Sequence, residues 1–561
     1  MWRERAGLFA IFGLSMAVVD PRGSFPLCDD WNFALATWHF ARTGSFVFSR
    51  YTAMSLRAQA VWGAVWTLLF GQSYEVLRFS TLVLSFGCVL LAHGLLRRLG
   101  VGPTGRIIGA LVFLFHPIFF WASYTYMTHI PFLFAALLGV YLFYRGMTED
   151  RVGFMIGGGV AVMAAYFVRQ TGVAVAVPAV LMLLWQRDRL ARRWKILLVG
   201  PVLSIVVFGP LFLFTDLLSG YPHQIDIHIQ VWNQGLLHSV IVAFSNAIHY
   251  TAVSFQYSTL FVLPLTVLVI GRGRINRKSV LWLALLVIPF LWVASGLVGA
   301  RAAIPWPGLG SVFTNLGLGP MTLRDVWILG LPYPIHLGYP ARIAVTYVTA
   351  VAGTFMVYRL GRAFGRASFG FQLLTLQCVL GLAALVPSDI YFDRYVLDSL
   401  WPLPFLLVLI IPLERTLAKA IATSLLTLVA FFSIAATHDY LAWNRARWQA
   451  FDRLQSEGVT LAQLEGGYEI NQYLLGGFNG TWDSAIVDDE YILAFNPVEG
   501  YRIVFGVPYR RLLGGGMGVV LAERRIGPSP RAPLDVKRKW LESGRRAADP
   551  NLGGVARSPS E

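Results

Sequence analysis

Long apolar segments recur along this chain, and short loops rich in arginine separate them. A backbone inside a bilayer must satisfy its own hydrogen bonds, so such segments cross only as helices or closed barrels. Barrel strands would give short segments of alternating polarity instead of unbroken apolar ones. A content of 56% hydrophobic and 14% charged residues is also too apolar for a soluble protein. The sequence therefore predicts an α-helical polytopic membrane protein.

We predict about thirteen membrane spans, each close to the ~20 residues that a crossing helix needs. They lie at about 5–19, 76–96, 107–122, 130–144, 153–168, 171–186, 196–215, 251–271, 279–298, 343–358, 367–386, 399–413 and 417–436. Arg3 and Arg5 precede the first segment as in a signal peptide, but we interpret it as an uncleaved anchor. Two apolar stretches, Ala58–Phe70 and Leu236–Phe244, are too short to cross, and we expect interfacial or re-entrant helices there.

Loop charge predicts the orientation. The formal net charge is +16, and most of the excess lies in alternate short loops, such as 187–195 and 272–278. Basic loops of this kind mark the cytoplasmic side, so the charge does not indicate nucleic-acid binding. We therefore expect a bacterial inner-membrane protein with the N-terminus inside and the C-terminus outside.

The predicted outer segments differ in character from the inner ones. Within a transmembrane domain at 1–436, the loops at 20–75, 216–250 and 299–342 are long and rich in aromatic residues, Gly and Pro. Loops of this length usually carry function. Residues 437–526 predict a small periplasmic α/β domain, with a helix at Tyr440–Gln455 and strands at Tyr501–Val507 and Met517–Ala522. The Pro-, Arg- and Ser-rich tail, 527–561, is expected to be disordered.

Two adjacent carboxylates, Asp29 and Asp30, open the stretch CDDWNFALATWHFARTGSF in the first outer loop. Apolar residues then recur every three to four positions, which predicts a helix that ends at Gly44. In the simplest interpretation Asp30 caps this helix and Asp29 is solvated. The alternative is a general base at the water–lipid boundary, with the second acid beside it.

DDWNFALATWHFARTGSF, followed by Gln59 and Trp62, resembles the first outer loop of GT-C membrane glycosyltransferases. The resemblance is to the bacterial branch that contains protein O-mannosyltransferases and the lipid A aminoarabinose transferase. The segments HPIFFWASYTYMTHIPFLF, YFVRQTG, NLGLGP, YFDRYVLDSLWPLP, NRARWQAFDRLQSEGV and GGYEINQ also look like parts of such proteins. The resemblance implies transfer of a sugar from a polyprenyl-phosphate donor to a lipid, glycan or protein acceptor. It assigns the base to Asp29.

His129 departs from the family pattern, because many relatives have Asp or Glu there. A histidine could donate a hydrogen bond to a phosphate or hydroxyl, or only satisfy a span end. Arg169 and Arg394 fall at outer ends of spans, where a cation suits a phosphate leaving group. Arg394 has the structural alternative of pairing with Asp393 or Asp389, whereas Arg169 has no acid nearby in sequence. Arg50 and Arg57 are further candidates for substrate binding.

A metal site is weakly indicated. His223, Asp226 and His228 are ligand types at close spacing, but a surface loop is favoured because no fourth ligand is evident. No cofactor is predicted, and a divalent metal stays an alternative. Two other functions stay open: a transporter or flippase of lipid-linked glycans, and a catalytically inactive GT-C scaffold. Against a transporter, the polar residues gather on one side only and no inverted repeat is visible.

Overall fold

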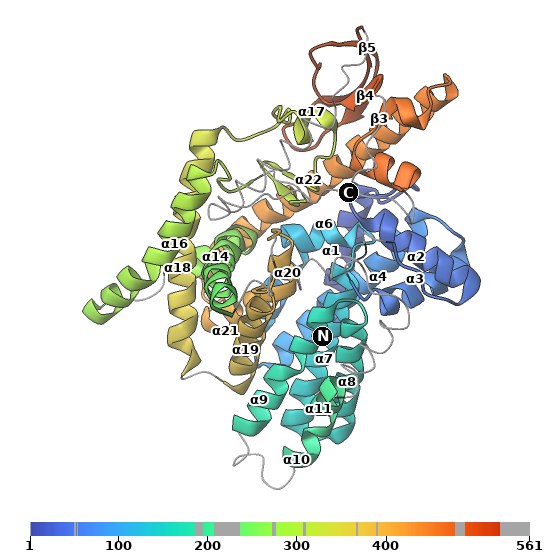
Figure 1. Ribbon diagram of the computed structural model, residues 1–561. Helices are drawn as coiled ribbons and strands as arrows, with labels where there is room; N and C mark the ends of the chain where they lie inside the picture. Colours follow the sequence, from blue (N-terminus) through green and yellow to red (C-terminus); the bar gives the residue numbers. More distant parts are fainter. Residues whose placement is uncertain are drawn as a thin grey trace.

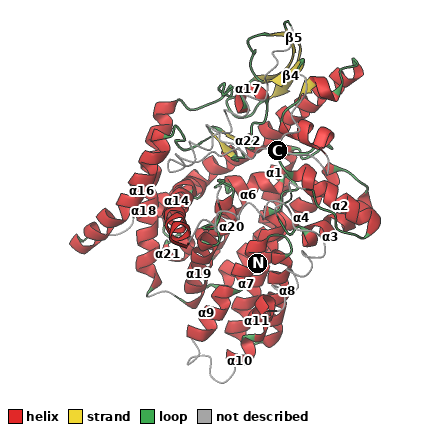
Figure 2. Ribbon diagram, in the orientation of Figure 1, coloured by secondary structure: helices red, strands yellow, loops and turns green. Residues whose placement is uncertain are grey.

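The computed structural model describes residues 2–49, 52, 54–185, 194–206, 236–271, 276–306, 310–365, 368–388, 391–476 and 489–527. Helices make up most of this part of the chain, and the strands gather at one end of it (Figure 2). The predicted fold class, a helical membrane protein with a small C-terminal sheet, is confirmed.

The described helices follow the apolar segments of the sequence. The first half contains α1 (Trp2–Val19), α2 (Asp30–Thr43), α3 (Arg57–Phe70), α4 (Tyr74–Arg98), α5 (Pro103–Leu114), α6 (Pro117–Ser123), α7 (His129–Glu149), α8 (Val152–Tyr166), η1 (Gln170–Val175), α9 (Val177–Trp185), α10 (Trp194–Leu197) and α11 (Val199–Val206). The second half contains α14 (Leu236–Phe261), α15 (Leu263–Ile270), α16 (Arg277–Gly299), α17 (Arg324–Trp327), α18 (Tyr339–Phe364), α19 (Phe369–Ala383), α20 (Tyr395–Leu400), α21 (Leu403–Ile410), α22 (Thr416–Ser456) and α23 (Tyr468–Ile470).

Five helices in the described ranges are long and apolar enough to cross a membrane, and two bent helix pairs bring the number to seven. The five are α4, α7, α18, α22 and the segment Ser279–Gly299 of α16. Shorter apolar helices, among them α8 and α19, accompany them. The chain therefore has a multi-pass architecture, while the number thirteen stays a prediction.

Two predicted spans are bent. The axes of α5 and α6 differ by 64°, and those of α14 and α15 by 103°. A proline lies in the first turn after each break, Pro117 in α6 and Pro264 in α15, where its missing N–H is tolerated. The predicted separate helix at Leu236–Phe244 is wrong, because those residues form the beginning of the continuous helix α14.

The loop at 20–75, which is predicted to lie outside, folds as the apolar pattern predicts. Helix α2 ends at Gly44, whose positive φ of 70° places its N–H 2.8 Å from the carbonyl of Phe40. Helix α3 covers the predicted interfacial stretch and packs on α2 and α4. One of its faces buries Ala60 and Ala64, and the other side exposes the apolar side chains of Val65 and Leu69. This amphipathic pattern suits a helix that lies along a lipid surface.

Helix α22 joins the membrane part to the C-terminal part. It runs without a break for 41 residues, so the predicted boundary at residue 437 falls inside it. Strands β3 (Leu464–Glu465), β4 (Tyr491–Ala494), β6 (Met517–Arg525) and β5 (Tyr501–Arg510) follow, in the sheet order β3-β4-β6-β5. Figure 1 shows this sheet at the end of the molecule opposite α9 and α10. The predicted strands at 501–507 and 517–522 are confirmed.

The loop between α16 and α18 lies beneath that sheet. It forms a short antiparallel hairpin, in which β1 (Phe313–Thr314) pairs with β2 (Gly317–Leu318). Helix α17 follows this hairpin. The buried Asp325 in α17 accepts hydrogen bonds from the backbone N–H groups of Phe495 and Asn496, 2.9 and 2.8 Å away. One carboxylate thus fastens this loop to the strand-bearing part of the chain.

Candidate functional site

Asp29 and Asp30 lie side by side in sequence but have different environments. Helix α2 begins at Asp30, and Asp29 occupies its N-cap position without a capping bond from the side chain. The Asp30 carboxylate turns away from the helix and accepts the N–H of Leu27 at 2.6 Å and the N–H of Tyr126 at 3.3 Å. The predicted N-cap role of Asp30 is therefore wrong, because its side chain joins two backbone segments that come together only in the folded chain.

Burial raises the pKa of the Asp30 carboxyl to about 7, although the Leu27 N–H and the nearby Arg78 oppose this rise. The side chain is sealed inside the protein, with 1% of the residue exposed. Asp30 therefore holds the loop in place from a buried position.

Asp29 keeps 30% of its side chain exposed, and two groups fix its orientation. The hydroxyl of Tyr468, in α23, donates to its Oδ1 at 2.9 Å. Its Oδ2 lies 3.4 Å from Nη2 of Arg394, the residue that precedes α20. Asp29 is thus an accessible carboxylate beside a buried guanidinium, an arrangement that suits proton transfer next to an anionic leaving group.

Arg394 does not pair with its sequence neighbour. The Asp393 carboxylate accepts the backbone N–H groups of Val312 and Phe313 instead, at 2.9 and 2.6 Å. Arg394 donates from Nη1 to the carbonyl of Gly310 at 2.6 Å and faces Asp29 with Nη2. Asp389, the other alternative partner, lies outside the described residues.

The second predicted cation, Arg169, also has an acidic partner. Its Nη2 lies 3.2 Å from Oδ2 of Asp398, and its Nη1 donates to the hydroxyl of Thr128 at 2.8 Å. The Asp398 carboxylate is shared, because Nδ1 of His129 lies 3.0 Å from its Oδ1. Arg169 has no acid nearby in the sequence, and the fold supplies Asp398 from a distant segment.

Asp398 is buried with this pair, and only 6% of its side chain is exposed. Burial opposes its negative charge, but Arg169 and His129 outweigh burial and lower the pKa of the Asp398 carboxyl. It therefore stays ionised and holds the guanidinium of Arg169 in place.

Helix α20 brings the two cations together. Arg394 precedes the helix and Asp398 follows four positions later, so both side chains leave the same face. Between them, the ring of Tyr395 lies 5.9 Å from the Arg169 guanidinium. Five predicted site residues therefore converge on one region: Asp29, Asp30, His129, Arg169 and Arg394.

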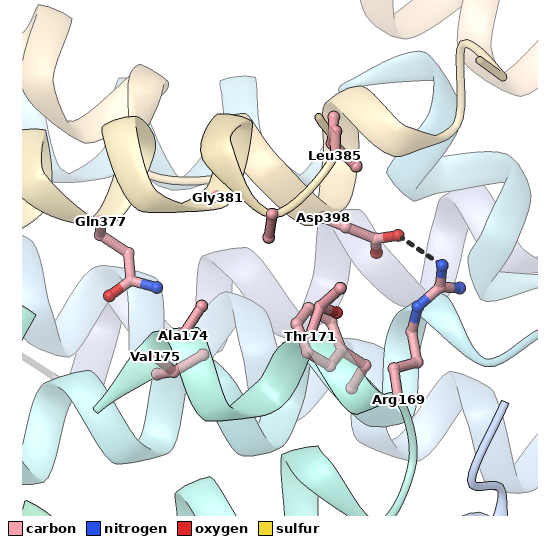
Figure 3. A pocket seen from close by; sticks show the side chains of 10 residues that line it. Arg169, Thr171, Ala174, Val175, Gln377, Gly381, Leu385 and Asp398 are labelled. Atoms are coloured by element: carbon pink, nitrogen blue, oxygen red, sulfur yellow. Dashed lines mark ion pairs between the residues drawn. The ribbon is translucent and has the colours of Figure 1, made fainter. Parts of the chain in front are cut away.

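A small cleft of about 20 Å³, with room for about one water molecule, lies next to this cluster. Figure 3 shows Arg169 and Asp398 at one end and Gln377 at the other, with α19 along one side and η1 along the opposite side. Apolar residues form most of the wall, among them Phe132, Val175, Ala384 and Leu385. The cleft thus has an apolar body with a charged pair at one end.

The remaining candidates divide into two groups. Arg57 begins α3, and the neighbouring N–H groups of Leu56 and Ala58 donate to the carbonyls of Val168 and Phe167, next to Arg169. Arg57 is buried, and its guanidinium lies 5.4 Å from the ring of Phe48.

The other candidates lie outside the described residues: Arg50, His223, Asp226 and His228. Within the part of the chain that is described, no three His, Cys, Asp or Glu side chains group as metal ligands.

Sequence reasoning missed three members of the site. Asp398 and Tyr468 bind predicted residues directly, and Glu469 accepts the N–H of Cys28 at 3.0 Å, one position before Asp29. All three lie in segments that carry the family resemblance, YFDRYVLDSLWPLP and GGYEINQ. That was the available signal, but nothing in their local spacing connects them with Asp29.

Comparison with known proteins supports the resemblance. Residues 61–214 match the family described as dolichyl-phosphate-mannose-protein mannosyltransferase, which confirms the predicted relationship to GT-C membrane glycosyltransferases for that part of the chain. No curated protein matches the sequence.

Solved structures with similar features share little sequence with this chain. ArnT from Cupriavidus metallidurans bound to undecaprenyl phosphate is 13% identical, with 93% of this chain and 98% of that chain covered and a TM-score of 0.41. The archaeal oligosaccharyltransferase AglB from Archaeoglobus fulgidus, in complex with an inhibitory peptide and a dolichol-phosphate, is 12% identical. That alignment covers 78% of this chain and 56% of AglB, with a TM-score of 0.41. At these values the similarities do not by themselves define what this chain does.

Proposed function

We propose that this protein is a membrane glycosyltransferase that moves a sugar from a polyprenyl-phosphate donor to an acceptor hydroxyl on the periplasmic face of a bacterial inner membrane. The observation that carries the proposal is the contact between Asp29 and Arg394, 3.4 Å apart. It places an accessible proton acceptor beside a buried cation, in the loop where the family resemblance assigns the base.

In the proposed reaction, Asp29 takes the proton from the acceptor hydroxyl. The acceptor oxygen then forms a bond with the anomeric carbon of the sugar, and the bond from that carbon to the phosphate oxygen breaks. The bonding electrons leave with the phosphate, whose growing negative charge a guanidinium stabilises. Arg394 contacts Asp29 and Arg169 lines the cleft, so we assign this role to them.

The guanidinium of Arg169 suits a lipid phosphate. It lies at the charged end of the cleft, whose wall is apolar beside α19 and η1. We therefore assign the donor phosphate to Arg169, with His129 and Arg57 as neighbours of that position. Binding would compete with Asp398 for the Arg169 guanidinium, because the carboxylate already holds one of its nitrogens. Arg50 stays a sequence-based candidate for the same role.

The test is transfer of sugar from a polyprenyl-phosphate donor by membranes that contain Asp29→Asn. Asparagine is nearly isosteric but takes no proton at neutral pH, so we expect turnover to fall by about 10²- to 10⁴-fold. Asp20→Asn is the matched control. Asp20 belongs to the same outer loop, its side chain is 34% exposed, and it pairs with Arg22 at 2.7 Å.

Near-normal turnover of Asp29→Asn at equal expression would refute Asp29 as the base. No transfer by the wild-type protein, combined with movement of the lipid-linked glycan across the membrane, would favour the transporter. No transfer by the wild-type protein, combined with binding of the lipid donor, would favour an inactive scaffold.

A further inference from the structure

The turn around Tyr468 reaches from the C-terminal part of the chain into the candidate site. The sequence GGYEINQ follows β3, and Tyr468 begins α23. Its hydroxyl donates to Asp29 across a sequence separation of 439 residues, at 2.9 Å. The ring also packs edge to face against Trp327 of α17, with ring centroids 5.4 Å apart.

The residue after Tyr468 anchors the turn. Glu469 accepts three hydrogen bonds: Cys28 N–H at 3.0 Å, the Thr322 hydroxyl at 2.7 Å and Arg447 Nη1 at 2.7 Å. The side chains of Glu469 and Arg447 are both fully buried. A buried ion pair is costly unless its hydrogen bonds are satisfied, and here one carboxylate binds the first outer loop, the third outer loop and α22.

The backbone of the turn leaves little freedom. Gly467 has a φ of +90°, and a Cβ there would lie 2.8 Å from the carbonyl oxygen of Thr322. A glycine is therefore required at this approach. Because Tyr468 lies between this glycine and the anchored Glu469, the position of its hydroxyl is fixed relative to the Asp29 loop.

A donor on one oxygen of a carboxylate has two consequences for a base. It limits rotation of the carboxylate, so the other lone pairs keep one direction, and it stabilises the charged form. Burial raises the pKa of the Tyr468 hydroxyl well above its usual range, and the nearby Asp29 raises it further, so Tyr468 keeps its proton and acts as the donor.

We propose that Tyr468 is a positioning residue for Asp29, and that the C-terminal segment thereby completes the site of the membrane domain. This inference rests on the proposed function, since it assigns Tyr468 to the same base. Tyr468 acts through Asp29 and takes no part in bond formation.

The test compares Tyr468→Phe, Asp29→Asn and the double variant in the same transfer assay. Tyr473→Phe is the matched control, because it removes a hydroxyl five residues further along and its ring packs on Tyr74. We expect Tyr468→Phe to lower kcat by about 10- to 100-fold with little change in donor KM, the range for losing a charged hydrogen bond. The double variant should lose no more than Asp29→Asn alone.

The double variant and the split between kcat and KM separate positioning from a merely structural role. A change that only lowers the amount of folded enzyme lowers the rate of the Asp29→Asn background as well, whereas a lost positioning contact costs nothing more once Asp29 is replaced. Tyr473→Phe should keep the wild-type kcat and donor KM.

The outcomes separate the two proposals. If Asp29→Asn is inactive and Tyr468→Phe keeps the wild-type kcat, the role of Tyr468 is overturned and the proposed function stands. Losses that multiply in the double variant would also overturn it. If Asp29→Asn stays active, Asp29 is not the base, and the role of Tyr468 as its positioning residue is refuted with it.

Discussion

Arg169→Ala is expected to impair use of the lipid donor. The Arg169 side chain is 9% exposed, lies on the wall of the cleft and has its guanidinium fixed by Asp398 and Thr128. A hydrogen bond to a charged group is worth about 1.5–3 kcal/mol, and each 1.4 kcal/mol is a factor of about ten. Loss of one guanidinium–phosphate contact should therefore raise the donor KM by about 10- to 150-fold. Arg169→Lys should recover part of this, because a lysine keeps the charge without the planar fork.

The assay is initial transfer rate against donor concentration in membranes of equal protein content. Arg362→Ala is the control, because Arg362 also makes two hydrogen bonds, to Ser279 and Tyr358, but lies at the C-terminal end of α18. Arg169→Ala leaves the Asp398 carboxylate without its cation, so the double variant with Asp398→Asn is measured too. If Arg169→Ala, the double variant and Arg362→Ala all show the same donor KM, Arg169 does not bind the phosphate.

Two further predictions concern stability and orientation. Asp30→Asn should keep most of the transfer activity, because asparagine still accepts the Leu27 N–H. The pKa of Asp30 is raised from 3.8 to about 7, so its carboxyl stabilises the fold at low pH and that contribution is lost as pH rises to about 7. The unfolding temperature of the wild type in detergent should therefore fall over this range relative to Asp30→Asn, and parallel curves would contradict the assignment. For orientation, phosphatase fusions should be inactive at residue 275 and active at residue 450, and the reverse pattern would invert the topology.

Local patterns predicted the local features of the site. The 3.6-residue period and Gly44 were enough to define α2, since both signals lie within a few residues of one another. The same reasoning failed for Asp30, because the partners that draw its carboxylate away from the helix end include Tyr126, 96 residues later. A capping preference is worth about 1 kcal/mol, so two buried backbone donors outweigh it.

Contacts between distant segments account for the other misses. His129 and Asp398 are 269 residues apart, and only the packing of α7 against α20 brings them together. Arg169 falls at the end of a predicted span, where an arginine needs a partner, but no rule of residue spacing identifies Asp398 as that partner. Leu236–Phe244 is too short to cross a membrane by itself, but the helix continues beyond it to Phe261, the last residue before the bend to α15.

The length of α22 links the membrane to the geometry of the site. Its 41 residues extend for about 60 Å, roughly twice the thickness of a bilayer core. Arg447 lies in the C-terminal half of the helix, and its ion pair with Glu469 fixes the turn that carries Tyr468. Helices adjust to thicker or thinner bilayers by tilting, and a tilt of about 5° moves a point ~30 Å along the axis by about 2.6 Å. Such a displacement is nearly the length of the Tyr468–Asp29 hydrogen bond, so turnover of any two variants is comparable only in bilayers of one thickness.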